Sequence, residues 1–499
     1  MRIVYELNDK LPPLAWAAHC NNGVTEVLHG NRVECTDSFF VDGAWNGGFK
    51  LGNFKSADWF CGTGGHVYED KVVFSTPTHV TSGLYLIKEN AEGGYCISNS
   101  LYLLMALNNF RLDPQYLNYE IDFNSITKGV YNYKEDIHVL DTEGEIREVK
   151  ILYFRNITIF ENNQVNIEVK PAVALFKDYN DYYTRLNSAI SGMCSNAQEA
   201  TRKFKYGLVT MISKGYDAPC CAAIAKMAGC DVALTFKAVG RYAEDSGVEI
   251  AKKLGYRNII EKDAMEYKTR EDFVEADYLC SGELGAEISF SAFDDYYEGN
   301  LVFSGERGDS IWDKHSVHRN SEFHVINMQS GLSAAERRLW KGYISVPMPL
   351  FGGTAWSSIF DISNSDEMKP WQMNNSYDRP IPRRIIEESG VPRECFGMEK
   401  RGAGFSYHYD WASRIKARMS NTSAESFGRY LKENRRFNIS AFVKFIWNTK
   451  EVYFNRLGIS KKKLDVEKLS QVANPTATRY LIPWAGNHVL QKYKKILEE

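Results

Sequence analysis

The fold of this 499-residue chain is decided by residues 208–236, which read Leu208-Val-Thr-Met-Ile-Ser-Lys-Gly-Tyr-Asp217-Ala-Pro-Cys-Cys-Ala-Ala-Ile-Ala-Lys-Met-Ala228-Gly-Cys-Asp-Val-Ala-Leu-Thr-Phe236. The apolar run 208–212 predicts a buried strand, and Pro219 fits the first turn of a helix, where a backbone N–H has no partner within the helix. Gly229 ends that helix, and 232–236 predicts the next strand. The loop 213–217 therefore follows the carboxyl end of a strand, where open α/β sheets bind ligands.

This loop offers the groups that bind a phosphate. Backbone N–H groups and the positive end of the following helix attract an anion. Ser213 adds a hydroxyl, Lys214 adds a charge, and Asp217 can hold a metal ion that bridges phosphate oxygens. The alternative is a tight turn in which Asp217 caps the helix. Since the loop has one glycine, the residues alone leave both interpretations open.

The loop resembles the SGGxDS pyrophosphate loop of the N-type ATP pyrophosphatases, which include asparagine synthetase and β-lactam synthetase. Ser213, Gly215 and Asp217 fall on motif positions, whereas Lys214 replaces a glycine and Ala218 replaces the closing serine. The resemblance implies a doubly wound parallel sheet of the PP-loop type.

A second segment, Asn300-Leu-Val-Phe-Ser304-Gly-Glu-Arg-Gly-Asp309-Ser-Ile-Trp312, predicts a strand entering a Gly-rich turn. It is similar to the SGxGxDE segment of asparagine synthetases. Ser304, Gly305, Glu306 and Asp309 match that segment, whereas Arg307 replaces a glycine and Ser310 replaces the final acid. Two such loops in one chain are more specific than either alone.

The resemblance implies a set of site residues. Asp217 and Asp309 would hold Mg²⁺ on the phosphates of ATP. Lys400 matches a lysine of that family that stabilises negative charge on the adenylating intermediate. The residues alone fit an ordinary surface lysine at position 400 equally well. Since neither aspartate has an obvious cationic partner in its own loop except Lys214 and Arg307, the two are expected to repel each other without a ligand. Asp217→Asn and Asp309→Asn are therefore expected to lower stability little. Arg379, Arg383 and Arg384 face either phosphate or solvent.

Around these loops, the pattern predicts a helix over 241–254 and a strand over 258–260, which complete a βαβαβ unit. The segment 278–287 predicts a Gly-rich loop entering a helix, with Glu283 and Glu287 in its first turns. It is either a capped helix start or the wall of an acceptor pocket.

Residues 1–171 contain many short runs of strand type, such as 71–75, 83–87 and 151–154, and predict a mostly antiparallel sheet layer. A helix over 98–108 and a hairpin turn over 141–145 interrupt them. The layout is similar to the amidotransferase half of asparagine synthetase, which implies a division into 1–171 and a synthetase part, 172–499, with a helical C-terminal extension. That family needs a cysteine at the mature N-terminus, and position 2 is Arg2, so no glutaminase activity is expected.

The composition argues against whole classes of partner. Lys and Arg number 60 against 63 Asp and Glu, so no strong field for nucleic acid or membrane exists. No apolar run reaches the length of a transmembrane helix. Ten scattered cysteines without a CxxC pair predict reduced thiols in a cytoplasmic protein. A homo-oligomer is compatible with the sequence.

We therefore expect an ATP-dependent, Mg²⁺-requiring, adenylate-forming synthetase. It would join a small or carrier-bound carboxylate to ammonia or another amine without hydrolysing glutamine, with Lys214 and Lys400 stabilising charge on the phosphates. The alternative is a non-catalytic nucleotide-binding or assembly protein, which the replacements at positions 214, 218, 307 and 310 support.

Overall fold

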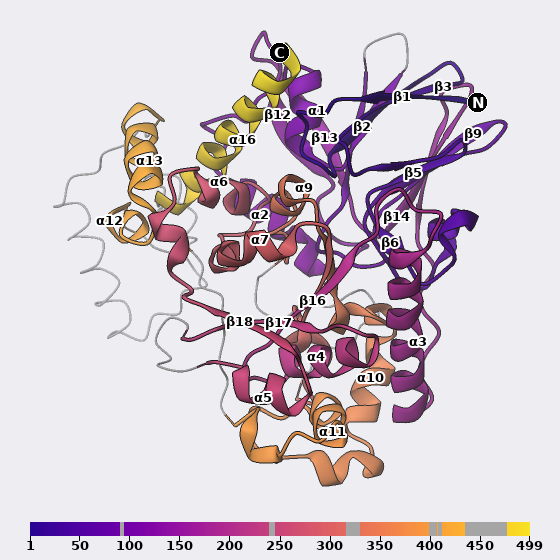
Figure 1. The fold of residues 1–499 in the computed structure, drawn as a ribbon. Helices are drawn as coiled ribbons and strands as arrows, with labels where there is room; N and C mark the ends of the chain where they lie inside the picture. Colours follow the sequence, from indigo (N-terminus) through magenta and orange to yellow (C-terminus); the bar gives the residue numbers. More distant parts are fainter. Residues whose placement is uncertain (90–93, 239–244, 316–329, 399–406, 408–411, 435–476) are drawn as a thin grey trace, which may run out of the picture.

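The computed structural model describes residues 1–89, 94–238, 245–315, 330–398, 407, 412–434 and 477–499 (Figure 1). Its N-terminal part is built from two large sheets and a two-stranded one. The larger sheet has the order β1-β3-β2-β11-β10-β13-β12, and the smaller one has the order β15-β14-β9-β8-β5-β4. All neighbours are antiparallel except β1 and β3, at the edge of the larger sheet.

The strands of this part are β1 (Arg2–Leu7), β2 (Trp16–Asn21), β3 (Val24–His29), β4 (Glu34–Cys35), β5 (Phe39–Val41), β6 (Ala44–Trp45), β7 (Phe60–Cys61), β8 (Gly64–Val67), β9 (Lys71–Ser75), β10 (Leu84–Lys88), β11 (Tyr95–Ser98), β12 (Asp136–Leu140), β13 (Ile146–Leu152), β14 (Arg155–Phe160) and β15 (Val165–Val169).

The two sheets pack face to face around alternating apolar residues. Trp16 lies 4.9 Å from the ring of Phe40, and both belong to one buried core with Phe74, Ile97 and Ile157. Every second residue of a strand faces the same side, so these runs bury one face of each sheet. The prediction of an antiparallel β-rich N-terminal part is confirmed.

Local signals placed several elements of this part correctly. The strand predicted at 71–75 is β9, and the turn at 141–145 joins β12 to β13, with the Asp141 N–H donating to the Glu145 carbonyl at 3.0 Å. The helix α1 (Leu101–Leu107) begins after Ser100, whose hydroxyl accepts from the Leu103 N–H at 3.2 Å. The strand predicted at 151–154 ends instead at Leu152, because Phe154 has a φ of +53°.

The C-terminal part contains a five-stranded parallel sheet in the order β18-β17-β16-β19-β20. Its strands are β16 (Gly207–Met211), β17 (Val232–Phe236), β18 (Asn258–Lys262), β19 (Asn300–Ser304) and β20 (Ile344–Pro347). The chain moves outward from β16 through β17 to β18 and then returns to the other side of β16. The direction of winding therefore reverses between β16 and β19, which is where such sheets bind ligands.

Both faces of this sheet are covered. Leu301 and Phe303 share a core with α4 (Asp217–Met227), whereas Val209 and Met211 share another with Phe293 of the 3-10 helix η5 (Ile288–Phe293). The long α3 (Tyr179–Gln198) lies on the α4 side, and α7 (Asp294–Tyr297) follows η5. Burial on both faces explains why the strands read as continuous apolar runs.

Two predicted helices differ from the structure. The helix expected over 241–254 corresponds to α5 (Val248–Lys253), which is shorter. It begins after Gly247, whose N–H donates to Thr235 Oγ1 at 2.8 Å. Residues 239–244 lie outside the described residues. Glu283 and Glu287 lie in a turn between α6 (Val274–Leu279) and η5, not in the first turns of a helix. The backbone of Gly282, with φ +100°, prevents a helix there.

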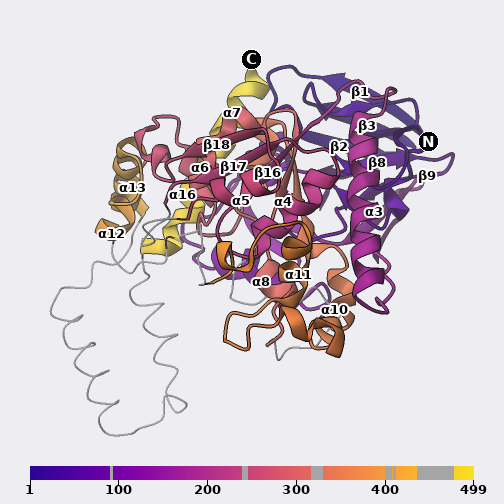
Figure 2. The ribbon, with the colours of Figure 1, turned by 60° about the horizontal axis from the view of Figure 1, so that its bottom comes forward.

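The other α-helices in the described residues are α2 (Tyr119–Phe123), α8 (Gly308–Ile311), α9 (Arg337–Lys341), α10 (Trp356–Ser363), α11 (Pro380–Glu388), α12 (Ala412–Lys416), α13 (Asn421–Asn434) and α16 (Leu481–Glu498). The C-terminal α16 packs on α1 and α6, on the side of the molecule opposite to α10 and α11 (Figures 1 and 2). Within the described ranges, every helix is too short or too polar to span the apolar part of a bilayer.

Candidate functional site

The loops after β16 and β19 open into one cleft of about 490 Å³. Six residues singled out from the sequence line this cleft: Ser213, Gly215, Asp217, Ser304, Gly305 and Asp309. The structure thus brings together two segments that are far apart in the chain, at the point where the winding of the sheet reverses.

Of the two lysines predicted for the site, Lys214 is among the described residues and Lys400 is not. Lys214 is not among the described residues that line the cleft; its N–H donates to Asp245 Oδ1 at 3.3 Å, and its carbonyl accepts from the Gly397 N–H at 2.9 Å. These bonds hold the loop between β16 and α4 against two other segments. Lys400 lies outside the described residues.

The two loops are packed so closely that only glycine fits between them. A Cβ atom added at Gly308 would lie 2.2 Å from Asp217 Cγ, and one added at Gly305 would lie 2.5 Å from the Ala218 nitrogen. Real Cβ atoms do not approach other atoms so closely, so the second loop rests directly on the start of α4.

Arg307 has a backbone conformation suited to glycine. Its φ is +67°, in the region that favours glycine, and the segment it resembles has a glycine at this position. The side chain is buried, with its guanidinium 3.5 Å from Glu283 and 3.6 Å from Glu306. Arg307 therefore adopts a backbone conformation that more often requires glycine, and the charge of its side chain is balanced by acids of the cleft.

Asp217 is paired with a cation that the sequence did not reveal. Its Oδ2 accepts a hydrogen bond from Arg379 Nη1, and the Arg379 side chain is only 5% exposed. Burial lowers the pKa of Arg379, but Asp217 and, more weakly, Asp309 raise it above its ordinary value. The expected repulsion between the two aspartates is therefore offset at Asp217, because Arg379 contacts it from the segment before α11.

The other two arginines of that segment are structural. Arg383 is fully buried, and its Nη2 donates to the Tyr216 hydroxyl and, at 3.4 Å, to the Gly397 carbonyl. Arg384 donates to Glu388 at 2.8 Å. Neither side chain lines the cleft, so both support the surroundings of the loop.

The cleft is strongly acidic. Among the described residues that line it, Arg307 is the one arginine or lysine, against six carboxylates: Asp217, Asp245, Glu283, Glu287, Glu306 and Asp309. Burial raises the pKa of Glu306 to about 7, although Arg307 lowers it. Burial and the neighbouring Glu306 and Glu283 raise the pKa of Glu287 well above its ordinary value. A triphosphate would be repelled here unless cations accompanied it.

The residues of the cleft fit a metal ion only when a bound ligand supplies part of its coordination. In the described part of the chain, no three His, Cys, Asp or Glu side chains are grouped to hold a metal ion. Mg²⁺ is commonly held by one or two carboxylates together with phosphate oxygens and water. Asp217 and Asp309 can supply such a pair of carboxylates, although Asp217 also accepts a hydrogen bond from Arg379.

Aromatic residues of the cleft were missed in the sequence. Phe236 and Phe290 lie with ring centroids 5.4 Å apart and both line the cleft. Tyr377 also lines it, with its hydroxyl 3.4 Å from the position of a Cβ on Gly215. The signal for Phe236 was available, since it ends a strand at the same sheet edge as the loop.

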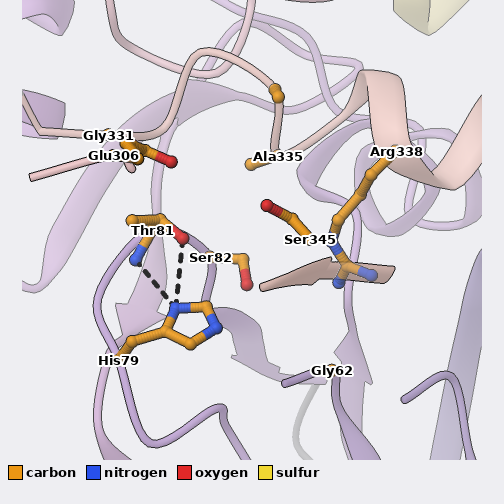
Figure 3. Close-up of a pocket in the computed structure, with 10 residues that line it drawn as sticks. Gly62, His79, Thr81, Ser82, Glu306, Gly331, Ala335, Arg338 and Ser345 are labelled. Carbon is orange, nitrogen blue, oxygen red and sulfur yellow. Dashed lines mark hydrogen bonds between the residues drawn. The ribbon is translucent and has the colours of Figure 1, made fainter. Parts of the chain in front are cut away.

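A second, smaller cavity joins the N-terminal part to the wall of the cleft (Figure 3). Its volume is about 10 Å³, enough for one water molecule. Glu306 and Ser345 line both spaces, and His79 and Arg338 close the smaller one. His79 Nδ1 accepts from the Thr81 N–H at 3.3 Å, which leaves the proton of the neutral ring on Nε2. Burial, helped by Arg338, lowers the pKa of His79 to about 3, so the ring is neutral.

The cysteines are not activated as nucleophiles. All ten are free, and desolvation raises the pKa of every one of them, to about 12 for Cys20 and Cys35. A nucleophilic cysteine needs the opposite shift. The thiols of this chain therefore stay protonated near neutral pH.

We expect no glutaminase activity, because none of these thiols forms a thiolate readily. Glutamate release from glutamine should equal that of a buffer blank in the wild type. Any release that disappears in a single Cys→Ala variant would contradict this expectation, whereas release that survives all ten substitutions would come from a contaminant.

Fold and site together define a mixed α/β protein with an acidic, two-loop cleft at the reversal point of a parallel sheet. No family model matches the chain, and a search of curated proteins finds no match.

Proposed function

We propose that the protein is an ATP-dependent synthetase of the PP-loop ATP pyrophosphatase type, which activates a small or carrier-bound carboxylate and passes the acyl group to ammonia or another amine. The observation that carries the proposal is the meeting of the two loops in one cleft, with Gly305 and Gly308 against the start of α4. The start of α4 at this place suits the phosphates of a nucleotide, because the N-terminal end of a helix attracts anions.

The chemistry assigns a role to each part of the cleft. A carboxylate oxygen would attack the α-phosphorus, the bond to the bridging oxygen would break, and pyrophosphate would leave. Ser213 and the N–H groups of loop 213–217 would hold that pyrophosphate. Mg²⁺ between Asp217 and Asp309 would supply positive charge against the phosphates.

The second half of the reaction is the attack of the amine on the activated carbonyl carbon, with loss of AMP and of one proton. Glu306 is placed to accept that proton, since its pKa of about 7 allows it to gain and lose a proton near neutrality. Phe236 and Phe290 offer an apolar wall for the base of the nucleotide. Lys214 and Lys400 remain the proposed charges near the phosphates.

Exchange of labelled pyrophosphate into ATP tests this proposal. Exchange that depends on Mg²⁺ and is stimulated by one member of a panel of carboxylic acids would support the synthetase. Absence of both exchange and nucleotide binding would refute it.

A second candidate is a nucleotide-binding protein without chemistry. Arg307 favours it, because this buried side chain stands where the related loops have glycine and holds two acids of the cleft in ion pairs. Asp217 is likewise engaged by Arg379. Tight binding of Mg-ATP without pyrophosphate exchange would select this function over the synthetase.

Gly215→Val is expected to weaken ATP binding by tenfold or more, because the side chain would fill space that a phosphate needs. The fold should tolerate the change, since a Cβ at Gly215 has its nearest neighbours at 3.4 and 3.6 Å. Titration calorimetry measures the affinity, and Gly428→Val in α13 is the matched control. Unchanged ATP affinity in folded Gly215→Val would show that the loop is an ordinary turn.

A further inference from the structure

The side of the cleft formed by α6 and the turn that follows it keeps a buried polar atom without a partner. Tyr278 lines the cleft and is fully buried, and its hydroxyl makes no hydrogen bond within the described ranges. A buried hydroxyl without a partner destabilises a fold, so such groups are uncommon in native proteins. Its persistence beside an open cleft indicates a ligand that supplies the missing bond.

Glu287, which also lines the cleft, has a second buried polar atom without a hydrogen-bond partner. Its Oε2 is shielded from solvent and makes no hydrogen bond to another described residue. Glu287 and Tyr278 line the cleft together with Tyr297 and Tyr343, whose ring centroids lie 4.9 Å apart. Glu287 and Tyr278 therefore belong to one continuous surface.

The charges on this surface select the ligand. Glu283, Glu287 and Glu306 lie close enough to influence one another, and Arg307 offsets only part of their charge. We call Tyr278, Glu283, Glu287, Glu306 and Arg307 the acidic wall. An anionic ligand would be repelled by it, and a neutral one would leave its charge uncompensated.

We infer that the acidic wall is a subsite for the primary ammonium group of an organic ligand. An ammonium has three hydrogens to donate, and carboxylate and hydroxyl oxygens are the acceptors that the wall leaves open. The inference rests on the proposed function, because it identifies the amine of that reaction as a cationic organic amine held in the same cleft as the phosphate loops. Glu306, which belongs to both the wall and the second loop, would lie next to the nitrogen.

Binding of an ammonium should release a proton. Burial and the neighbouring Glu306 and Glu283 raise the pKa of Glu287, whereas a bound cation would lower it and favour the ionised form. The groups that face Glu287 are Glu283, Glu306, Arg307, Tyr297 and Tyr343. The affinity should therefore increase as the pH rises, in the direction opposite to a simple loss of charge on the ligand.

Titration calorimetry of the full chain with 1,4-diaminobutane, without nucleotide, tests the inference. The diamine should bind the wild type, with proton release seen as a dependence of the heat on the ionisation enthalpy of the buffer. Succinate and 1,4-butanediol, of the same length, should not bind. Binding of succinate, or no binding of the diamine, would overturn the inference.

The variants Glu287→Gln and Tyr278→Phe locate the ligand. Each should weaken diamine binding at least tenfold, whereas Glu249→Gln, an exposed control on α5, should not. Melting temperatures should stay level or rise in both variants, since one relieves repulsion between acids and the other removes a hydroxyl without a partner. If Glu287→Gln fails to fold, Tyr278→Phe decides alone; unchanged affinity in a folded variant would overturn the inference.

The outcome is distinguishable from failure of the proposed function. ATP binding that is sensitive to Gly215→Val, together with no diamine binding, would refute the ammonium subsite alone. Diamine binding that depends on Glu287, together with no nucleotide binding, would refute the synthetase and leave an amine-binding site.

Discussion

Asp217→Asn is expected to lower the free energy of unfolding by about 3 kcal/mol and to abolish Mg²⁺-dependent ATP binding. The substitution removes the carboxylate that neutralises Arg379, whose side chain is 5% exposed. A buried guanidinium without its counter-charge is unfavourable, and an amide replaces only part of the interaction. The value lies at the lower end of the range for buried pairs because Asp217 keeps 21% of its side chain exposed.

Urea denaturation measures the stability, and titration calorimetry with Mg-ATP measures the binding. Asp309→Asn is the variant to compare with it, because Arg379 donates a hydrogen bond to Asp217 and has only a weaker electrostatic interaction with Asp309. This variant should retain most of the stability and still lose Mg-ATP affinity. Asp366→Asn, at a carboxylate with 91% exposure, should change neither quantity.

Two results would contradict this account. Wild-type stability in Asp217→Asn would mean that repulsion between the two aspartates outweighs the pairing with Arg379. Wild-type Mg-ATP affinity in both aspartate variants would remove the metal role from the two loops.

Gly308→Ala is the second substitution with a large expected effect, of about 3 kcal/mol on unfolding. The new methyl carbon would start 2.2 Å from Asp217 Cγ, so either Asp217 or the loop after β19 must move. Such a shift separates the two loops, and ATP affinity should fall at least as far as in Gly215→Val. Gly428→Ala is the control, since its Cβ would meet only the flexible end of Lys416 at 3.5 Å.

A double variant identifies the cause. Removing the side chain of Asp217 in Gly308→Ala/Asp217→Gly should make the two losses of stability less than additive, because the clash disappears with its partner. Strict additivity, or wild-type ATP affinity in Gly308→Ala, would show that the contact between the loops does not hold the site together.

The elements with strong local signals were predictable from the sequence. The strands β9 and β17 have the predicted bounds, since each is a short apolar run between turn residues. The parallel α/β character followed from the strand, helix and strand of 208–236. Departures occurred where one backbone angle decides the outcome, as at Phe154 and Gly282.

The candidate site was predictable in its loops and not in its charges. The turn residues of 213–217 and 304–309 are local features, and the carboxyl ends of neighbouring parallel strands necessarily share one sheet edge. The family resemblance implied that Asp309 would lie near Asp217, and both line the same cleft.

By itself, then, the sequence determined the strands, the helix after each loop and the glycines that the turns require, because these depend on residues within a few positions of one another. Only the tertiary structure decided that Arg379 pairs with Asp217 across 162 positions, and that Tyr278 and Glu287 share one wall with Arg307. Burial and distance set the pKa of a carboxyl group and the identity of its partner, and both arise only when distant segments are packed together.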